Sequence, residues 1–154
     1  MEQQNKEPID RSIQINDIEL KTHKSIDPIY SGSIISLREG YSKIELRTSP
    51  EMSVDQLGLV HGGFIFSAAD HAAMVAVNEP NVVLATAKTT FFAPAKLGDT
   101  IFFEAQVYQR ESRRRIINVK AKILDIKIFE GEFSAVVLDR HVLRLKLNHN
   151  LNED

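Results

Sequence analysis

The residues best suited to chemistry are an isolated carboxylate and a pair of glycines that precedes it. Asp70 stands in the run FIFSAADHAAMVAVN, which is rich in alanine and otherwise almost entirely apolar. A carboxylate in such surroundings is costly to bury, so it needs a partner or a chemical task. A carboxylate in an apolar groove is a candidate general base or nucleophile.

Gly62 and Gly63 come immediately before this apolar run. Glycines at the start of a helix permit close approach to the backbone and leave the N–H groups of the first turn pointing outward. Together with the helix dipole, those donors can hold a carbonyl oxygen that becomes an oxyanion. The pair of glycines therefore predicts a site for a polarised carbonyl group.

The residues alone leave simpler interpretations open. Two glycines before a helix are often ordinary turn chemistry, and a single helical Asp is often hydrogen-bonded to backbone or placed at an interface. His61 alone is most simply a structural histidine. His71 follows Asp70 directly, but adjacent residues on a helix point about 100° apart, so we do not expect a paired His–Asp site. The five histidines lack the spacing of a metal site, and we expect no metal.

The composition is that of an ordinary soluble globular protein. The chain has 154 residues, of which 43% are hydrophobic and 26% charged, with a net charge of −2 and no cysteine. The absence of cysteine excludes disulfides, thiolate zinc sites and a cysteine nucleophile. The charge argues against broad binding to nucleic acid, and no apolar run reaches the length of a membrane span. The polar beginning, MEQQNKEPIDRS, is not a secretory signal, so we expect a cytoplasmic protein with no nucleic-acid or membrane partner.

The hydrophobic pattern predicts strands on both sides of one buried helix. Residues 30–37 and 41–48 flank a short turn with glycine and predict a hairpin. The apolar run after Gly63 predicts a helix that is buried on most sides and ends at Asn78-Glu79-Pro80. Four further strands are predicted at residues 82–92, 100–110, 115–124 and about 132–143.

One α+β domain over residues 1–154 accounts for this order of elements, with a sheet wrapped around the helix. The polar segments at about residues 1–14 and 147–154 are predicted to be flexible arms. Periodicity does not fix the order of the strands in the sheet.

Two motifs in this order resemble a known family. They are His61-Gly62-Gly63 with Asp70 nine residues after the histidine, and then Phe91, Pro94, Gly98 and Asp99. The pattern resembles the hotdog-fold acyl-CoA thioesterases of the phenylacetate-pathway type, over roughly residues 30–143. It is also similar to acyl-CoA-binding hotdog proteins of epsilon-proteobacteria. The resemblance implies an antiparallel sheet of about six strands around one long helix, in a homodimer or a higher assembly of dimers.

The resemblance also implies roles for individual residues. Asp70 matches the carboxylate that activates water or attacks the thioester, and the N–H of Gly62, from the other subunit, matches the donor to the thioester carbonyl. The expected catalytic set is Asp70, Gly62, Asp55 and His61. Asp55 is a departure, because relatives often carry Asn there to position water or the carbonyl, and Asp cannot donate a hydrogen bond as Asn does. Leu84 is another, at a position where some relatives have a hydroxyl residue.

Coenzyme A carries phosphates, so we expect a basic rim around the site. It would enter as part of the substrate or ligand, and no separate cofactor is expected. The expected substrate-binding residues are Gly63, Lys88, Phe91, Phe92, Pro94, Lys96, Arg113, Arg114 and Arg115. For the acyl chain, Phe64, Phe66 and Met74 are further candidates beside Phe91 and Phe92. The arginines are equally consistent with a solvated turn, and the aromatic residues with plain core.

Two hypotheses about function follow from the resemblance. The first is hydrolysis of an acyl-CoA thioester at a dimer interface. The second is a non-catalytic acyl-CoA-binding or sensing protein with a regulatory role. One fold hosts both functions, so the fold does not decide between them.

Overall fold

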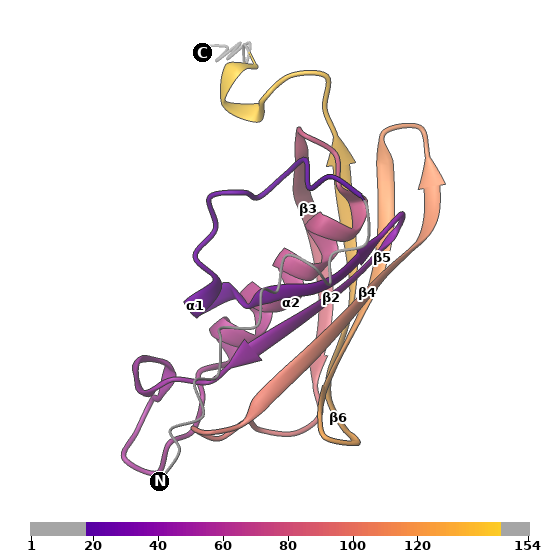
Figure 1. The fold of residues 1–154 in the computed structure, drawn as a ribbon. Helices are drawn as coiled ribbons and strands as arrows, with labels where there is room; N and C mark the ends of the chain where they lie inside the picture. Colours follow the sequence, from indigo (N-terminus) through magenta and orange to yellow (C-terminus); the bar gives the residue numbers. More distant parts are fainter. Residues whose placement is uncertain (1–17, 146–154) are drawn as a thin grey trace, which may run out of the picture.

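A computed structural model describes residues 18–145, and both predicted arms lie outside this range. In chain order its elements are the helix α1 (Pro28–Ser31), the strands β1 (Ser33–Arg38) and β2 (Tyr41–Arg47), the helix α2 (Gly62–Val77), and the strands β3 (Val82–Phe91), β4 (Thr100–Glu111), β5 (Arg114–Ile123) and β6 (Ile126–Val137) (Figure 1). Short 3₁₀ turns occupy Pro50–Met52 and Val142–Arg144. No helix within residues 18–145 has both the length and the apolar character needed to cross a membrane.

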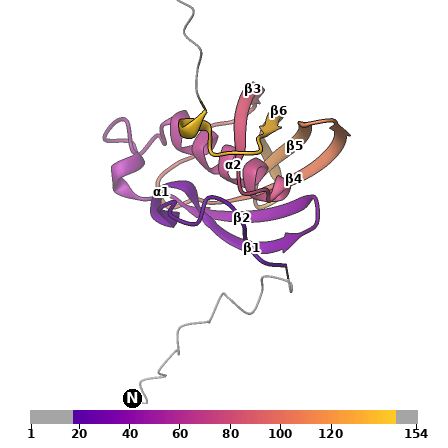
Figure 2. The ribbon, with the colours of Figure 1, turned by 90° about the horizontal axis from the view of Figure 1, so that it is seen from above.

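The six strands form one antiparallel sheet in the order β1-β2-β4-β5-β6-β3. The chain passes through α2 between β2 and β3, and this connection carries β3 to the edge opposite β1. Figure 2 shows the sheet curving around α2. The predicted α+β hotdog architecture is therefore confirmed.

Alternation along the strands turns one face of the sheet toward α2. In β4, Ile101, Phe103 and Ala105 are buried, whereas Glu104 and Gln106 between and after them are exposed. A period of two places successive side chains on opposite faces, so the apolar set faces the helix and the polar set faces outward.

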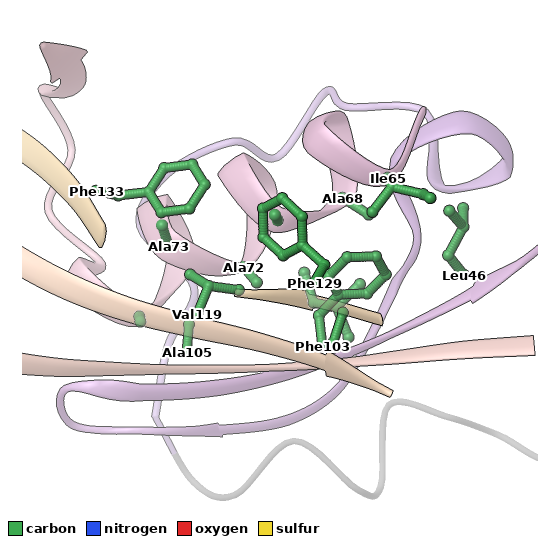
Figure 3. Packing of buried hydrophobic residues seen from close by; sticks show 14 of the residues in the cluster. Leu46, Ile65, Ala68, Ala72, Ala73, Phe103, Ala105, Val119, Phe129 and Phe133 are labelled. Atoms are coloured by element: carbon green, nitrogen blue, oxygen red, sulfur yellow. The ribbon is translucent and has the colours of Figure 1, made fainter. Parts of the chain in front are cut away.

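The core lies between α2 and the concave face of the sheet (Figure 3). Ala68, Ala72 and Ala73 of α2 are fully buried, as are Phe103 and Phe129 of the sheet. Small side chains on the helix let its backbone approach the sheet, and the phenylalanines fill the space between them. The prediction of a helix buried on most sides is confirmed, because buried residues follow one another from Ala68 to Ala76 with Asp70 as the one interruption.

The first strand begins at Ser33 and not at residue 30 as predicted. The preceding residues form α1, because the side chain of Asp27 accepts a hydrogen bond of 2.9 Å from the N–H of Ile29 and Pro28 occupies the first turn. Gly32 then ends the helix with a φ of 83°, a backbone conformation that favours glycine.

The last strand begins at Ile126 and ends at Val137, whereas the sequence predicted residues 132–143. Only Leu124 and Asp125 separate the paired residues Ile123 and Ile126, so the β5–β6 hairpin is tighter than expected. Residues 126–131 belong to β6, although the sequence did not predict a strand there. Lys127 makes this part of the strand more polar.

Candidate active site

The first turn of α2 presents unpaired backbone donors. The helix begins at Gly62, after an extended His61 with φ −61° and ψ 128° whose side chain makes no capping hydrogen bond. Within residues 18–145, the amides of Gly62 and Gly63 donate to no protein acceptor. Such amides, at the positive end of the helix dipole, are suited to binding a carbonyl oxygen that gains negative charge.

The ring of His61 folds back over Gly63. A Cβ atom on Gly63 would lie 2.7 Å from Nε2 of His61, so this ring position requires glycine. The same ring meets Phe64 edge-on, with centroids 6.0 Å apart. The structure therefore gives His61 a packing role at the entrance of α2 and gives its exposed imidazole no acidic partner among the described residues.

An apolar cavity of about 300 Å³ adjoins the start of α2. It is lined by Val60, Gly62, Ile65, Phe91, Phe92, Ala93, Pro94 and Ala95. A Cβ atom on Gly62 would lie 3.4 Å from Cε1 of Phe91, so the aromatic ring covers the glycine directly. The structure thus brings the predicted residues Gly62, Phe91, Phe92 and Pro94 to one cavity, although α2 and nearly all of β3 lie between Gly62 and Phe91 in the chain.

Asp70 is a half-buried carboxylate without a hydrogen-bond partner at its inner oxygen. Its Oδ1 atom is shielded from solvent and makes no hydrogen bond to any described residue. Desolvation by burial raises the pKa of Asp70 from 3.8 to about 6. A carboxylate with this pKa is ionised at neutral pH and is a stronger base than a free one, as a general base requires.

The polar residues of α2 have two different surroundings. Ser67 hydrogen-bonds with its Oγ to Oγ of Ser31 at 2.8 Å, and Nδ1 of His71 donates to the carbonyl of Ser31 at 2.9 Å. Phe66, one turn before Asp70, contacts Phe133 of β6 instead, with ring centroids 5.7 Å apart. Asp70, four residues after Phe66, lies on the same face of the helix as Phe66, and this face points away from α1.

Gly62 and Asp70 of one chain cannot contact the same thioester group. Asp70 lies eight positions after Gly62 on the same helix, which is about 12 Å along the helix axis at 1.5 Å per residue. A hydrogen bond to the carbonyl oxygen and an attack at the neighbouring carbon need groups within about 3 Å of the reacting atoms. If both residues act on one carbonyl, they come from two copies of the chain.

Asp55 is committed to the loop that precedes α2. Its Oδ1 atom accepts hydrogen bonds from the N–H groups of Leu57 at 3.0 Å and Leu59 at 3.2 Å. This arrangement closes a turn, as Asp side chains often do. Asp55 is exposed and does not line the cavity at Gly62.

The predicted cations lie in different parts of the fold. Lys96 follows Ala95 of the cavity wall. Its backbone forms an isolated antiparallel β-bridge with Leu59. Lys88 is exposed on the outer face of β3, opposite Glu132 of β6. The three predicted arginines lie at the other end of the sheet.

Arg113, Arg114 and Arg115 form the turn and first residues of the β4–β5 hairpin. Arg113 is ion-paired with Asp139 at 2.6 Å, and Nη1 of Arg115 donates to two neighbouring carbonyls. Arg114 pairs with Val136, next to the Val82 end of β3, whereas the cavity lies at the Phe91 end. One chain therefore does not bring the arginines to its own Gly62.

One cation beside the cavity was missed by the sequence analysis. Nζ of Lys127 lies 5.1 Å from the ring centroid of Phe92. The sequence offered no signal for this contact, because it depends on the tight β5–β6 hairpin and on the pairing of β6 with β3. Within residues 18–145, no group of three His, Asp or Glu side chains is arranged to hold a metal ion.

A family model described as the thioesterase superfamily matches residues 57–128. The matched segment contains the start of α2, Asp70, all of β3 and the cavity residues that follow it.

Two curated proteins illustrate the range of relatives. The chain is 45% identical over 121 residues to methylthioribose-1-phosphate isomerase of Aquifex aeolicus, a match that covers 79% of this chain and 26% of that protein. It is 26% identical over 114 residues to transcription factor FapR of Thermoanaerobacter sp. (strain X514), covering 73% of this chain and 57% of that protein. The chain thus spans about a quarter of the first relative and just over half of the second.

Solved structures match most of the chain. An uncharacterized protein of Pyrococcus horikoshii is 44% identical with a TM-score of 0.81, covering 82% of this chain and 97% of that one. A sigma28-regulated virulence protein of Campylobacter jejuni is 35% identical with a TM-score of 0.80, covering 82% and 89%. A Streptococcus mutans protein bound to acetyl CoA is 18% identical with a TM-score of 0.67, covering 77% and 97%, a likeness of fold alone.

Proposed function

The chain belongs to the hotdog-fold thioesterase superfamily, and we propose that it hydrolyses the thioester of an acyl-coenzyme A at a site between two copies of the chain. The observation that carries the proposal is the carboxylate of Asp70, which is half-buried, has no hydrogen-bond partner for Oδ1 among residues 18–145 and has a pKa raised to about 6. A stabilising role would give this carboxylate partners; a general base needs it unpaired and basic.

In the proposed reaction, the N–H of Gly62 donates a hydrogen bond to the thioester carbonyl oxygen. Asp70 of the other copy takes a proton from a water molecule, whose oxygen forms a bond to the carbonyl carbon. The resulting oxyanion is held by the Gly62 amide and the helix dipole. It collapses by breaking the carbon–sulfur bond, and the thiolate of coenzyme A leaves and takes up a proton.

The edge strand β3 supports a site made by two copies. Among the described strands β3 pairs with β6 alone, and Ala85, Thr86 and Ala87 in its middle are exposed. An open edge of this length favours pairing with another strand. Antiparallel pairing of two β3 strands would bring the Val82 end of one copy, with its arginines, next to the Phe91 end of the other.

The ligand class is supported by the relatives and by the cavity. The Streptococcus mutans protein of the same fold binds acetyl CoA. In this chain the cavity wall is apolar, with Phe91 and Phe92 both about half exposed beside the amide of Gly62. An apolar slot next to a polarising donor suits an acyl thioester.

A second candidate function is acyl-CoA sensing without hydrolysis. Asp55 favours it, because its carboxylate is occupied by the N–H groups of Leu57 and Leu59 and offers no donor to a water molecule or a carbonyl. The similarity to transcription factor FapR agrees with a regulatory role for this part of a protein.

A thiol-release assay over a panel of acyl-CoAs, run beside calorimetric binding on the same preparation, tests both functions. Hydrolysis predicts free coenzyme A in an amount that grows with time and enzyme concentration. Tight binding without thiol release would overturn hydrolysis and favour the sensor. Neither binding nor release with any acyl-CoA would overturn both.

A further inference from the structure

Lys127 stands beside the wall of the apolar cavity, although it is remote from that wall in sequence. Its ammonium group lies over the ring of Phe92, 5.1 Å from the centroid, and Phe92 lines the cavity together with Gly62. The backbone fixes this proximity, because the N–H of Phe92 donates to the carbonyl of Ile128 at 2.7 Å. Lys127 is therefore attached to the same structural unit as the cavity wall.

The ammonium group is held in place and retains free donors. It bonds to Oε2 of Glu130 at 2.7 Å, and this bond lowers the pKa of the Glu130 carboxyl. An ammonium group has three donors, so one bond to Glu130 leaves two. The side chain of Lys127 is 40% exposed, so these donors are accessible from solvent.

From this placement we propose that Lys127 binds a phosphate group of coenzyme A when the thioester lies in the cavity. The inference rests on the proposed acyl-CoA ligand. A phosphate has charged acceptor oxygens, and an ammonium ion binds them as a point charge. Phe92 links the two parts of the ligand site, since it lines the apolar slot and its ring also contacts the ammonium group.

A second lysine in the fold has the same local chemistry in a different place. Nζ of Lys43 lies 5.3 Å from the ring centroid of Phe102 and 3.7 Å from Oε1 of Glu104. This group is on the outer face of β2 and β4 and does not border the cavity at Gly62. Lys43 is therefore a matched control for loss of a lysine that is paired with Phe and Glu.

The test compares two thioesters that share an uncharged hexanoyl chain, hexanoyl-CoA and hexanoyl-pantetheine, of which only the first carries phosphates. With Lys127→Gln we expect KM for hexanoyl-CoA to rise about tenfold, the loss of one charge-assisted hydrogen bond, and KM for hexanoyl-pantetheine to stay the same. Lys127→Arg should restore most of the affinity, and Lys43→Gln should match the wild type with both thioesters. Calorimetric dissociation constants for coenzyme A and pantetheine give the same comparison without turnover.

The outcomes separate the inference from the function on which it rests. An equal rise for both thioesters would assign Lys127 to packing against Phe92 and would overturn the phosphate contact. An unchanged KM for hexanoyl-CoA with Lys127→Gln would overturn it as well, with hydrolysis by the wild type still standing. A wild-type protein that neither binds nor hydrolyses any acyl-CoA would overturn the proposed function and this inference with it.

Discussion

The Nδ1 atom of His71 donates a hydrogen bond of 2.9 Å to the backbone carbonyl of Ser31. Donation to a carbonyl requires the hydrogen on Nδ1, so Nε2 is the unprotonated nitrogen, and it is buried without a partner in the described part of the chain. Burial lowers the pKa of His71 and keeps the ring neutral. Asp70, the preceding residue, has no comparable bond for Oδ1 to any described residue, so His71 connects α1 to α2 and Asp70 remains available for chemistry.

Replacement of His71 should affect stability more than activity. His71→Ala removes the bond to Ser31 and leaves a cavity, so we expect the free energy of unfolding to fall by about 2–4 kcal/mol. Urea denaturation measures this loss. The specific activity of the folded fraction should change little, and a large loss of activity at unchanged stability would contradict the assignment.

Asp70→Asn should abolish most of the hydrolysis and preserve binding. Asn has nearly the shape of Asp but cannot accept a proton from water, so we expect kcat to fall by about 10²-fold or more. The dissociation constant for a non-hydrolysable acyl-CoA analogue should change by less than about threefold, because apolar and basic groups hold the ligand. Undiminished thiol release by the folded variant would remove Asp70 from the mechanism.

The raised pKa of Asp70 predicts a pH-dependent cost in stability. The carboxyl has a pKa of about 6 in the fold and 3.8 unfolded, so between these values the folded state binds more protons and stability falls as pH rises. Above about pH 6 the full cost is present, at most about 3 kcal/mol for a shift of this size. Asp70→Asn should therefore be more stable than the wild type at pH 8 and equally stable at pH 3.5. Denaturant titrations at the two pH values measure the difference. His71 is present in both proteins, so its own titration contributes equally to both.

The local patterns in the sequence predicted most of the fold because they are properties of neighbouring residues. The alternation at Ile101, Phe103 and Ala105 and the run of alanines in α2 both survive in the structure. The prediction was wrong where one short-range contact overrides the pattern, as at Asp27, whose side chain caps α1 in place of a longer first strand.

The parts of the site that a motif marks were easier to predict than the parts that the fold assembles. Gly62 and Phe91 belong to motifs, and the structure places them in contact. Lys127 reaches Phe92 only through the β5–β6 hairpin, and no spacing in the sequence encodes that contact. Asp55 illustrates the reverse. Its position matches a motif, but in the structure its carboxylate accepts hydrogen bonds from the N–H groups of Leu57 and Leu59 in its own loop.

The backbone donor at Gly62 can be removed without disturbing the helix. Gly62 is the first residue of α2 and His61 before it is extended, which is the backbone that proline favours at this position. Gly62→Pro should keep the fold and lower kcat by about 10²–10³-fold, the scale for loss of one oxyanion donor. Gly62→Ala is the matched control, because it adds a Cβ at an ordinary 3.4 Å from Phe91 and retains the N–H. Equal activity of the Pro and Ala variants would contradict the role of the amide.

Mixing two inactive variants tests whether Gly62 and Asp70 act across two copies. In a dimer of one Asp70→Asn chain and one Gly62→Pro chain, one site carries both changes and the other combines an intact Asp70 with an intact Gly62. Random pairing after refolding an equal mixture makes half of the dimers mixed, so about a quarter of the wild-type sites should return. Thiol release by the mixture, compared with each variant refolded alone, measures this recovery, and sedimentation of the same samples shows whether the 17.4 kDa chain is a dimer. If both residues acted within one chain, every site in the mixture would carry one defect and activity would stay at the level of the separate variants.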